Sequence, residues 1–362
     1  MKEEIYDGRS NNFALLHLSG VALVLSGHMY VLMGAAPPTV LGNQLHGLGV
    51  ELLFLLSGFL VTQSLLRKKN LAEYYRNRIA RIFPPLVFCL VLLLLAGWFL
   101  TEEQSIFYLQ GAWTYFWHNL LMSPYFYVPG LFENLPVKST LNGSLWSLPI
   151  EMMCYLLLPL VLLGSRNPHH KSNYVRFALL WALLMLCGWR VDHLGVDAPS
   201  LVIWGTNWVN AFRLIAFFAS GSFVSHLLFF HSEFKKYLRP EFAVLLVVIC
   251  EIGGMGFSPM RYVVLPYTAL SVALAPPMRS AFFNRHEYTY GLYLFAYPVQ
   301  QSLLWVFEKQ RGSFPPVWIM LLLAFTITLL MAAITSELVE KPIGRFIKKH
   351  PFPAHDHSAS TN

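Results

Sequence analysis

The chain has 362 residues, of which 56% are hydrophobic, 15% aromatic and only 12% charged. A soluble domain carries roughly 25% charged residues, so this composition and a mean hydropathy of +0.50 indicate a polytopic membrane protein. Disordered, collagenous, coiled-coil and disulfide-rich secreted chains are excluded, because each needs polar bias, a fixed period or dense cysteine. The net charge of +7 is not arranged as a basic tract interleaved with aromatic residues, and we expect no nucleic acid partner.

The sequence contains ten apolar runs that we interpret as membrane spans, since about 17 to 25 apolar residues cross a bilayer core. They are Phe13–Met33, Leu45–Leu66, Ile82–Leu100, Ser144–Gly164, Phe177–Trp189, Asn207–Phe230, Phe242–Phe257, Tyr262–Met278, Tyr288–Phe307 and Pro316–Ser336. The stretch Ile106–Leu121 is rich in Trp, Tyr and Phe, which favours an interfacial or re-entrant segment. The expected fold is an all-α integral membrane protein, a polytopic bundle of about ten transmembrane helices.

The Lys and Arg residues predict the orientation, because cytoplasmic loops carry an excess of positive charge. With the N-terminus inside, the inner segments hold 20 of the 26 Lys and Arg residues, the outer segments hold 5, and Arg213 lies within a span. Both termini are therefore expected in the cytoplasm. Residues 1–349 form the predicted transmembrane domain, and residues 350–362, polar and Pro-containing, form a predicted disordered cytoplasmic tail. We expect no metal site.

Ionisable side chains within spans are functional candidates, because each costs about 2.5 to 3.5 kcal/mol to insert. His17 and His28 are eleven residues apart, about 16 Å of helical rise and close to three turns, so both lie on one face of the first span. Counting from the span ends predicts that His28, Glu51 and Glu151 share one depth in the outer half. A buried neutral imidazole beside a carboxylate can act as a general base; the alternative is that His28 serves as a hydrogen-bonding residue between helices.

The segment RKKNLAEYYRNRIARIFPP on the cytoplasmic side contains a second candidate site. Arg78 and Arg81 are three residues apart, hence on one helical face, and paired guanidinium groups bind phosphate oxygens. The alternative is a topology anchor on anionic lipid. Pro84–Pro85 is predicted to end this helix or to begin the next span.

Five segments, taken in order, resemble the membrane-bound acyltransferase-3 family of bacterial integral-membrane glycan O-acyltransferases. These are NNFALLHLSGVALVLSGHMY, LGVELLFLLSGFLVTQSL, YYRNRIARIFPPL, the stretch around LNGSLWSLPIEMM, and EYTYGLYLFAYPVQ followed by SELVEKP. The resemblance spans nearly the whole chain. Two departures stand out: the family pattern has Arg at the position of His17, and it commonly has His where this chain has Ala296.

The resemblance implies a role for each matched residue. His28 is the expected catalytic histidine, with Glu151 or Glu51 orienting its imidazole. Arg78 and Arg81 are the expected arginine pair at the donor entrance, and Arg76 and His17 are grouped with them as donor-binding candidates. The residues expected to line or support the site are Ser57, Gly58, Phe59, Trp146, Ser147 and Glu151.

The expected function is transfer of an acyl group, with acetyl the expected one, from cytoplasmic acyl-CoA to a hydroxyl of an extracytoplasmic or lipid-linked glycan. We expect acyl-CoA as the donor substrate, with no tightly bound cofactor, and a glycan or lipid-linked saccharide as the acceptor. The protein is expected to be surrounded by membrane lipid, as a multi-pass protein of the bacterial cytoplasmic (inner) membrane. Whether His28 is a base or carries the acyl group stays open, as does the oligomeric state. Two alternatives remain: a lipid-linked glycan transporter or flippase using the buried groups as a proton relay, and a catalytically impaired member, suggested by His17.

Overall fold

The chain is helical almost throughout in the computed structural model, which describes residues 11–67, 70–103, 106–163, 171–194, 200–253, 258–276 and 288–350. The β structure within these ranges is two short antiparallel hairpins, β1 (Thr39–Val40) with β2 (Asn43–Gln44) and β3 (Val202–Ile203) with β4 (Thr206–Asn207). The predicted tail beyond His350 and the first ten residues lie outside the described residues.

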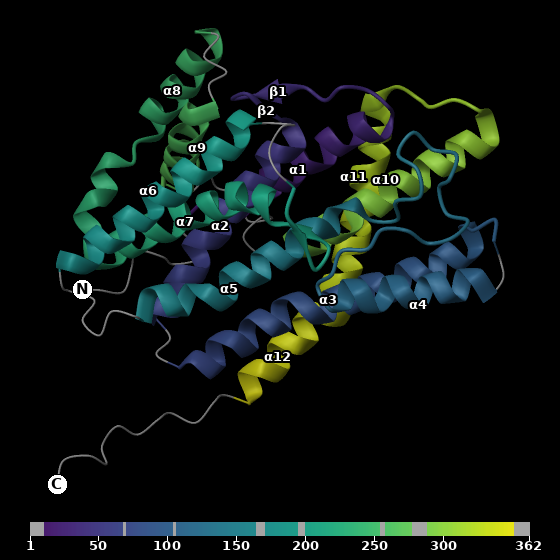
Figure 1. The fold of residues 1–362 in the computed structure, drawn as a ribbon, viewed down its shortest axis with the longest axis horizontal. Coiled ribbons are helices and arrows are strands. Elements are labelled where there is room, and N and C mark those ends of the chain that lie inside the picture. Colours follow the sequence, from purple (N-terminus) through teal and green to yellow (C-terminus); the bar gives the residue numbers. More distant parts are fainter. Residues whose placement is uncertain are drawn as a thin grey trace.

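The helices form one bundle (Figure 1). In chain order they are α1 (Phe13–Leu32), α2 (Leu45–Arg67), α3 (Leu71–Leu100), α4 (Ile106–Leu120), α5 (Leu148–Leu163), α6 (Lys171–Leu194), α7 (Trp208–Phe230), α8 (Pro240–Ile252), α9 (Ser258–Ala273), α10 (Thr289–Arg311), α11 (Val317–Thr335) and α12 (Lys341–Lys349). The 3₁₀ turn η1 (Gly143–Ser147) precedes α5, η3 (Ser232–Tyr237) follows α7, and the π-helical turn η4 (Ser336–Glu340) joins α11 to α12. In Figure 1, α8 and α9 lie at one edge and α3, α4 and α12 at the other.

Seven helical stretches in the described part of the chain are long and apolar enough to cross a membrane. They are Phe13–Leu32, Leu45–Arg67, Leu71–Leu100, Gly143–Leu162, Val175–Leu194, Trp208–Phe230 and Val317–Lys349. Each of the ten predicted spans overlaps a helix, but α8 and α9, with 13 and 16 residues, are short, and α10 has 23 residues with many polar ones. An all-α, multi-pass membrane protein is confirmed, whereas the count of ten and the orientation stay predictions.

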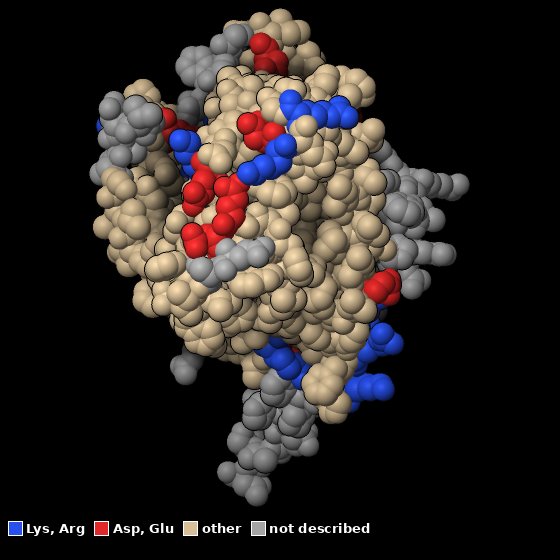
Figure 2. All heavy atoms as spheres, turned by 90° about the vertical axis from the view of Figure 1, so that its right-hand side faces the viewer, with Lys and Arg blue, Asp and Glu red and all other residues tan. Residues whose placement is uncertain are grey.

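The molecular surface matches this class of protein. Figure 2 shows a face on which acidic and basic side chains gather in one patch, with further Lys and Arg at the lower edge and a broad uncharged area between them. Large apolar side chains are exposed along several helices, among them Leu160 at 70%, Trp113 at 67% and Leu322 at 62%. Apolar surface of this extent needs lipid or protein to cover it.

Helix α3 runs unbroken for 30 residues with Pro84 and Pro85 inside it, so the prediction that the two prolines end a helix was wrong. A proline within a helix removes a backbone hydrogen bond, at a cost of about 3 kcal/mol. Packing offsets that cost here: Ile82 and Leu86 are fully buried, and the Tyr290 hydroxyl of α10 donates to the Ile82 carbonyl at 3.2 Å. The arginine segment and the apolar segment of α3 are therefore one continuous helix.

Helix α2 packs against α7 with almost no side chain between the two backbones. A Cβ atom at Gly58 would lie 2.0 Å from the Phe218 carbonyl oxygen, and one at Gly221 would lie 2.0 Å from the Leu55 carbonyl oxygen. Only glycine allows this approach at both positions. Gly58, which belongs to the second motif of the resemblance, thus fixes the helix that carries Ser57.

Candidate active site

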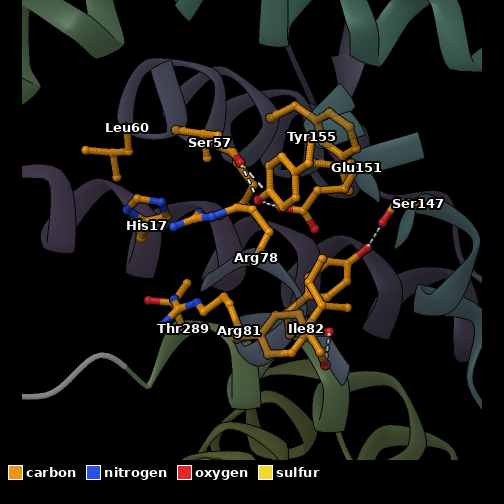
Figure 3. A pocket seen from close by; sticks show the side chains of 16 residues that line it. His17, Ser57, Leu60, Arg78, Arg81, Ile82, Ser147, Glu151, Tyr155 and Thr289 are labelled. Atoms are coloured by element: carbon orange, nitrogen blue, oxygen red, sulfur yellow. Dashed lines mark hydrogen bonds between the residues drawn. The ribbon is translucent and has the colours of Figure 1, made fainter. Parts of the chain in front are cut away.

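A cavity of about 300 Å³ lies where α1, α2, α3, η1, α5 and α10 meet (Figure 3). Its polar and charged lining consists of His17, Ser57, Arg78, Arg81, Ser147, Glu151, Tyr155, Thr289, Tyr290 and Tyr293. Six of the residues selected from the sequence are brought together here, although they come from five separate elements. They are His17, Ser57, Arg78, Arg81, Ser147 and Glu151.

The arginine pair stands on the first half of α3. Asn70 starts this helix, because its side chain accepts hydrogen bonds from the backbone N–H groups of Ala72 and Glu73. The Arg78 guanidinium lies over the Tyr155 ring, 5.6 Å from the ring centre, and its buried Nε has no hydrogen-bond partner within the described residues. Two guanidinium groups thus face one carboxylate in the cavity, and this excess of positive charge suits a phosphate group.

Glu151 sits in the first turn of α5 and is held by two hydroxyl groups. Its Oε1 accepts from Ser57 Oγ at 3.3 Å and from the Tyr155 hydroxyl. The two hydroxyl oxygens are 2.8 Å apart. Tyr155 follows Glu151 by four residues, so both side chains leave the same face of α5. The hydrogen bonds to this carboxylate thus come from two neutral hydroxyl groups.

The Asn-Gly-Ser-Leu-Trp segment forms η1, which closes the cavity beside α10. The Asn142 side chain caps the turn by accepting from Ser144 N at 3.1 Å and donates to the Leu294 carbonyl at 2.9 Å. The Tyr293 hydroxyl donates to the Ser144 carbonyl at 2.9 Å. A phenol has one hydrogen, so Ser147 Oγ, at 2.5 Å, donates to Tyr293. This packing aims Ser147 at the cavity.

His17 lines the same cavity from α1, and Figure 3 shows its ring close to the Arg78 side chain. Its Nδ1 lies 2.9 Å from the Phe13 carbonyl oxygen. Because a carbonyl only accepts, Nδ1 carries a hydrogen and the ring orientation is set by its own helix. The residue that replaces the arginine of the family pattern therefore remains beside the arginine pair.

His28 lies outside this cavity, three turns further along α1. Its ring centre is 5.3 Å from that of His46 on α2 and 5.3 Å from that of Tyr297 on α10. The Nδ1 atom is buried and has no hydrogen-bond partner in the described part of the chain. The imidazole is thus neighboured by two aromatic rings, and neither predicted carboxylate is hydrogen-bonded to it among the described residues.

Glu51 belongs to a buried ion-pair cluster instead. Its Oε2 lies 3.0 Å from Arg261 Nε, its Oε1 lies 3.4 Å from Arg213 Nε, and Asn43 donates to Oε1 at 2.9 Å. Asp192 joins the cluster by pairing with both arginines. Glu51 is fully buried and Arg261 is 3% exposed, so the cluster ties α2, α6, α7 and α9 together.

The sequence predicted one shared depth for His28, Glu51 and Glu151, but the structure gives the three residues separate sets of partners. The prediction counted Glu151 from an assumed outer end of its span. The turn η1 that precedes α5 is itself buried, with Ser144, Leu145 and Ser147 inside the molecule. Glu151 lines one cavity with Arg78 and Arg81, which the sequence placed on the cytoplasmic side, so counting along the apolar run did not locate it.

The remaining sequence candidates lie around the cavity and do not line it. Arg76 Nη1 donates to the His350 carbonyl at 2.5 Å. Trp146 packs against the hydrophobic core. Phe59 is fully buried, with its ring centre 5.0 Å from that of Phe13, and so supports α1 and α2.

The sequence reasoning missed the tyrosines. Tyr155 lines the cavity from α5, and Tyr290 and Tyr293 line it from α10. Tyr297, one turn beyond Tyr293, contacts His28. A tyrosine hydroxyl in an apolar run needs a partner, and the spacing of three and four residues on α10 was the available signal.

Comparison with known proteins assigns the class. A family model described as "Acyltransferase domain" matches residues 19–336, so the chain belongs to this acyltransferase family, and the resemblance seen in the sequence is confirmed. The protein is an acyltransferase with a membrane-spanning helical fold.

Several proteins with assigned names are similar to this chain in sequence. The chain is 25% identical over 346 residues to the O-acetyl transferase of Shigella phage Sf6, covering 92% of this chain and 96% of that one. It is 25% identical over 362 residues to nodulation protein 10 of Rhizobium leguminosarum bv. viciae, covering 92% and 93%. It is 24% identical over 332 residues to O-acetyltransferase OatA of Staphylococcus aureus, covering 82% of this chain and 52% of OatA. No solved structure matches the chain significantly.

Proposed function

We propose that this membrane O-acyltransferase moves an acetyl group from cytoplasmic acetyl-CoA to a hydroxyl of an extracytoplasmic or lipid-linked glycan, in the bacterial cytoplasmic membrane. The observation that carries the proposal is the cavity in which Arg78 and Arg81 face Ser57, Ser147 and Glu151. Two of the relatives are named as O-acetyl transferases, which supports acetyl as the acyl group.

The arginine pair is the proposed binding site for the phosphate groups of the acyl donor. Guanidinium groups bind phosphate oxygens through paired, charge-assisted hydrogen bonds, and CoA carries phosphates at the end remote from its thioester. Arg78 and Arg81 lie in the first half of α3, which the positive-inside pattern predicts to be at the cytoplasmic face. The thioester then extends along the cavity toward Val50 and Tyr293, which line it as well.

His28 lies about one helical turn beyond the end of this cavity. The same distance follows from α2 and from α10. Val50 lines the cavity, and His46, four residues before it on α2, contacts His28. Tyr293 lines the cavity, and Tyr297, four residues after it on α10, also contacts His28. Four residues of helix rise about 6 Å, a distance that the pantetheine arm of CoA spans easily.

The proposed reaction uses His28 as a general base. The imidazole takes the proton of the acceptor hydroxyl as the hydroxyl oxygen attacks the thioester carbonyl. A carbon–oxygen bond forms, the carbon–sulfur bond breaks, and the imidazolium returns its proton to the leaving CoA sulfur. In a variant of this scheme His28 accepts the acetyl group first and passes it to the hydroxyl.

The proposal is tested in cells that lack the endogenous gene and produce either the wild-type chain or His28→Ala. Mass spectrometry of the surface polysaccharide should show an added mass of one acetyl group per modified sugar with the wild type and none with His28→Ala. His226→Phe, which changes a buried histidine of α7 stacked on Phe177, is the matched control and should retain acetylation. Full acetylation by His28→Ala removes the mechanism, and glycan export without any acetyl transfer by the wild type favours a transporter.

A further inference from the structure

His46 is a histidine of α2 that contacts His28, and neither the sequence motifs nor the proposed mechanism assigns it a role. It is the second residue of α2 and precedes the Gly-Val segment that carries the family resemblance. Its ring centre lies 5.3 Å from that of His28, and the two ring planes are inclined by 30°. The side chain is therefore a direct neighbour of the proposed base.

Each of the two imidazoles has a buried nitrogen atom without a hydrogen-bond partner among the described residues. In both His28 and His46 this atom is Nδ1. Buried polar side-chain atoms are normally hydrogen-bonded, and leaving one unpaired costs about 1 to 3 kcal/mol. Two such atoms on adjacent rings mark a place where a polar group of a ligand is expected to bind.

Gly27 explains how the two rings come together. A Cβ atom at this position of α1 would lie 2.3 Å from the backbone N of His46 and 2.9 Å from its Nδ1. Only a residue without a side chain lets α2 approach α1 so closely, one residue before His28. The pairing of the histidines is thus built into the contact between two buried helices.

His46 lies on the side of His28 that faces away from the donor cavity. The donor cavity reaches Val50, and His46 lies one turn further toward the start of α2, beside the β1–β2 hairpin. Gln44, two residues before His46, is exposed, so the chain next to His46 reaches the molecular surface. With the donor approaching His28 from the cavity, the His46 side is left for the acceptor.

We propose that His46 is a positioning residue for the acceptor: its Nδ1–H donates a hydrogen bond to the acceptor hydroxyl oxygen while that hydroxyl donates to His28 Nδ1. The inference rests on the proposed acetyl transfer and adds the residue that holds the acceptor. The proton of the hydroxyl goes to His28 when the new carbon–oxygen bond forms, and the proton of His46 stays where it is. His46 orients the oxygen lone pair toward the thioester carbon, which is the contribution of fixed geometry to the rate.

The substitutions His46→Asn, His46→Gln and His46→Phe separate this role from a structural one. The amide of Asn places a donor at the distance of Nδ1 from the backbone, whereas the amide of Gln places it at the distance of Nε2. Phe keeps the ring shape and removes the donor. In the deletion cells, polysaccharide acetylation should stay within about threefold of wild type with Asn and fall at least about tenfold with Gln and with Phe.

A second measurement shows whether the variants are intact. Purified wild-type and variant proteins in detergent should bind radiolabelled acetyl-CoA with dissociation constants within about twofold of one another, because His46 lies outside the donor cavity. Acetylation by His46→Phe at the wild-type level overturns the inference, and so does an equal loss with Asn and Phe or a loss of acetyl-CoA binding by Phe. If the wild type itself adds no acetyl group, the proposed function fails as a whole, which is a different result from any of these.

Discussion

The guanidinium of Arg78 lies 5.6 Å above the centre of the Tyr155 ring, so a cation on α3 is stacked on an aromatic side chain of α5. The same tyrosine donates its hydroxyl to Glu151. One side chain therefore supports the expected phosphate-binding group with its ring and restrains the nearby carboxylate with its oxygen.

Replacing Arg78 by Lys should raise the KM for acetyl-CoA about tenfold, because an ammonium group neither stacks on Tyr155 nor binds phosphate with two parallel hydrogen bonds. Steady-state release of the CoA thiol measures this. Arg239→Lys is a matched control and should leave the KM unchanged, since the exposed Arg239, just before α8, lies over the Phe242 ring at 6.0 Å from the ring centre. An unaltered KM in Arg78→Lys would show that the donor phosphates bind elsewhere.

Replacing Tyr155 by Phe should raise the KM for acetyl-CoA about fivefold. The ring under Arg78 is kept, but Glu151 loses a donor and becomes free to pair with the guanidinium groups in competition with phosphate. The double variant Tyr155→Phe with Glu151→Gln should recover most of the affinity, because the competing charge is gone. Additive losses in this double-mutant cycle would contradict the coupling.

Replacing Glu51 by Gln should lower the thermal stability of the purified protein and leave acetyl-CoA binding intact. Breaking a fully buried ion pair costs about 3 kcal/mol or more, because the remaining charge stays buried without compensation. Glu337→Gln removes the exposed ion pair with Lys341 and should change the midpoint very little. A melting curve of Glu51→Gln that coincides with wild type would show that the cluster contributes no net stability.

Replacing Gly58 by Ala should destabilise the bundle, since the new methyl group would lie 2.0 Å from the Phe218 carbonyl oxygen and must push α2 and α7 apart. The comparison is Gly344→Ala on α12, where a Cβ atom meets nothing within 4 Å and alanine favours the helix by about 1 kcal/mol. Thermal unfolding in detergent should therefore shift in opposite directions for the two variants. A neutral Gly58→Ala would mean that the two helices separate easily.

The class of fold was predictable because apolar runs and low charge are properties of the sequence itself. The positions of the helices followed, and so did the grouping of Arg78 and Arg81, which depends only on spacing within one helix. The joining of Ser57, Ser147 and Glu151 to that pair also followed from the resemblance, because its motifs come from different spans.

The sequence could not show which side chains each buried polar residue contacts in the folded bundle. Glu51 and Glu151 look alike in the sequence, since each is a lone acid in an apolar run. Glu51 meets Arg261 and Glu151 meets Tyr155 because of which helices are adjacent, and adjacency is not encoded in periodicity. The prolines of α3 misled for a related reason, since the packing that offsets their cost comes from α10.

The tight contact between α2 and α7 has a consequence for acyl-chain selectivity. No methyl group fits between the backbones of α2 and α7, so α2, which lines the cavity, cannot move back toward α7 to admit a larger acyl group. Helix α10 instead presents side chains along the proposed path of the thioester, Tyr293 in the cavity and Tyr297 beside His28, and side chains can be exchanged for smaller ones. If acetyl is the group transferred, as proposed, variants that accept propionyl or butyryl donors are therefore to be sought on α10.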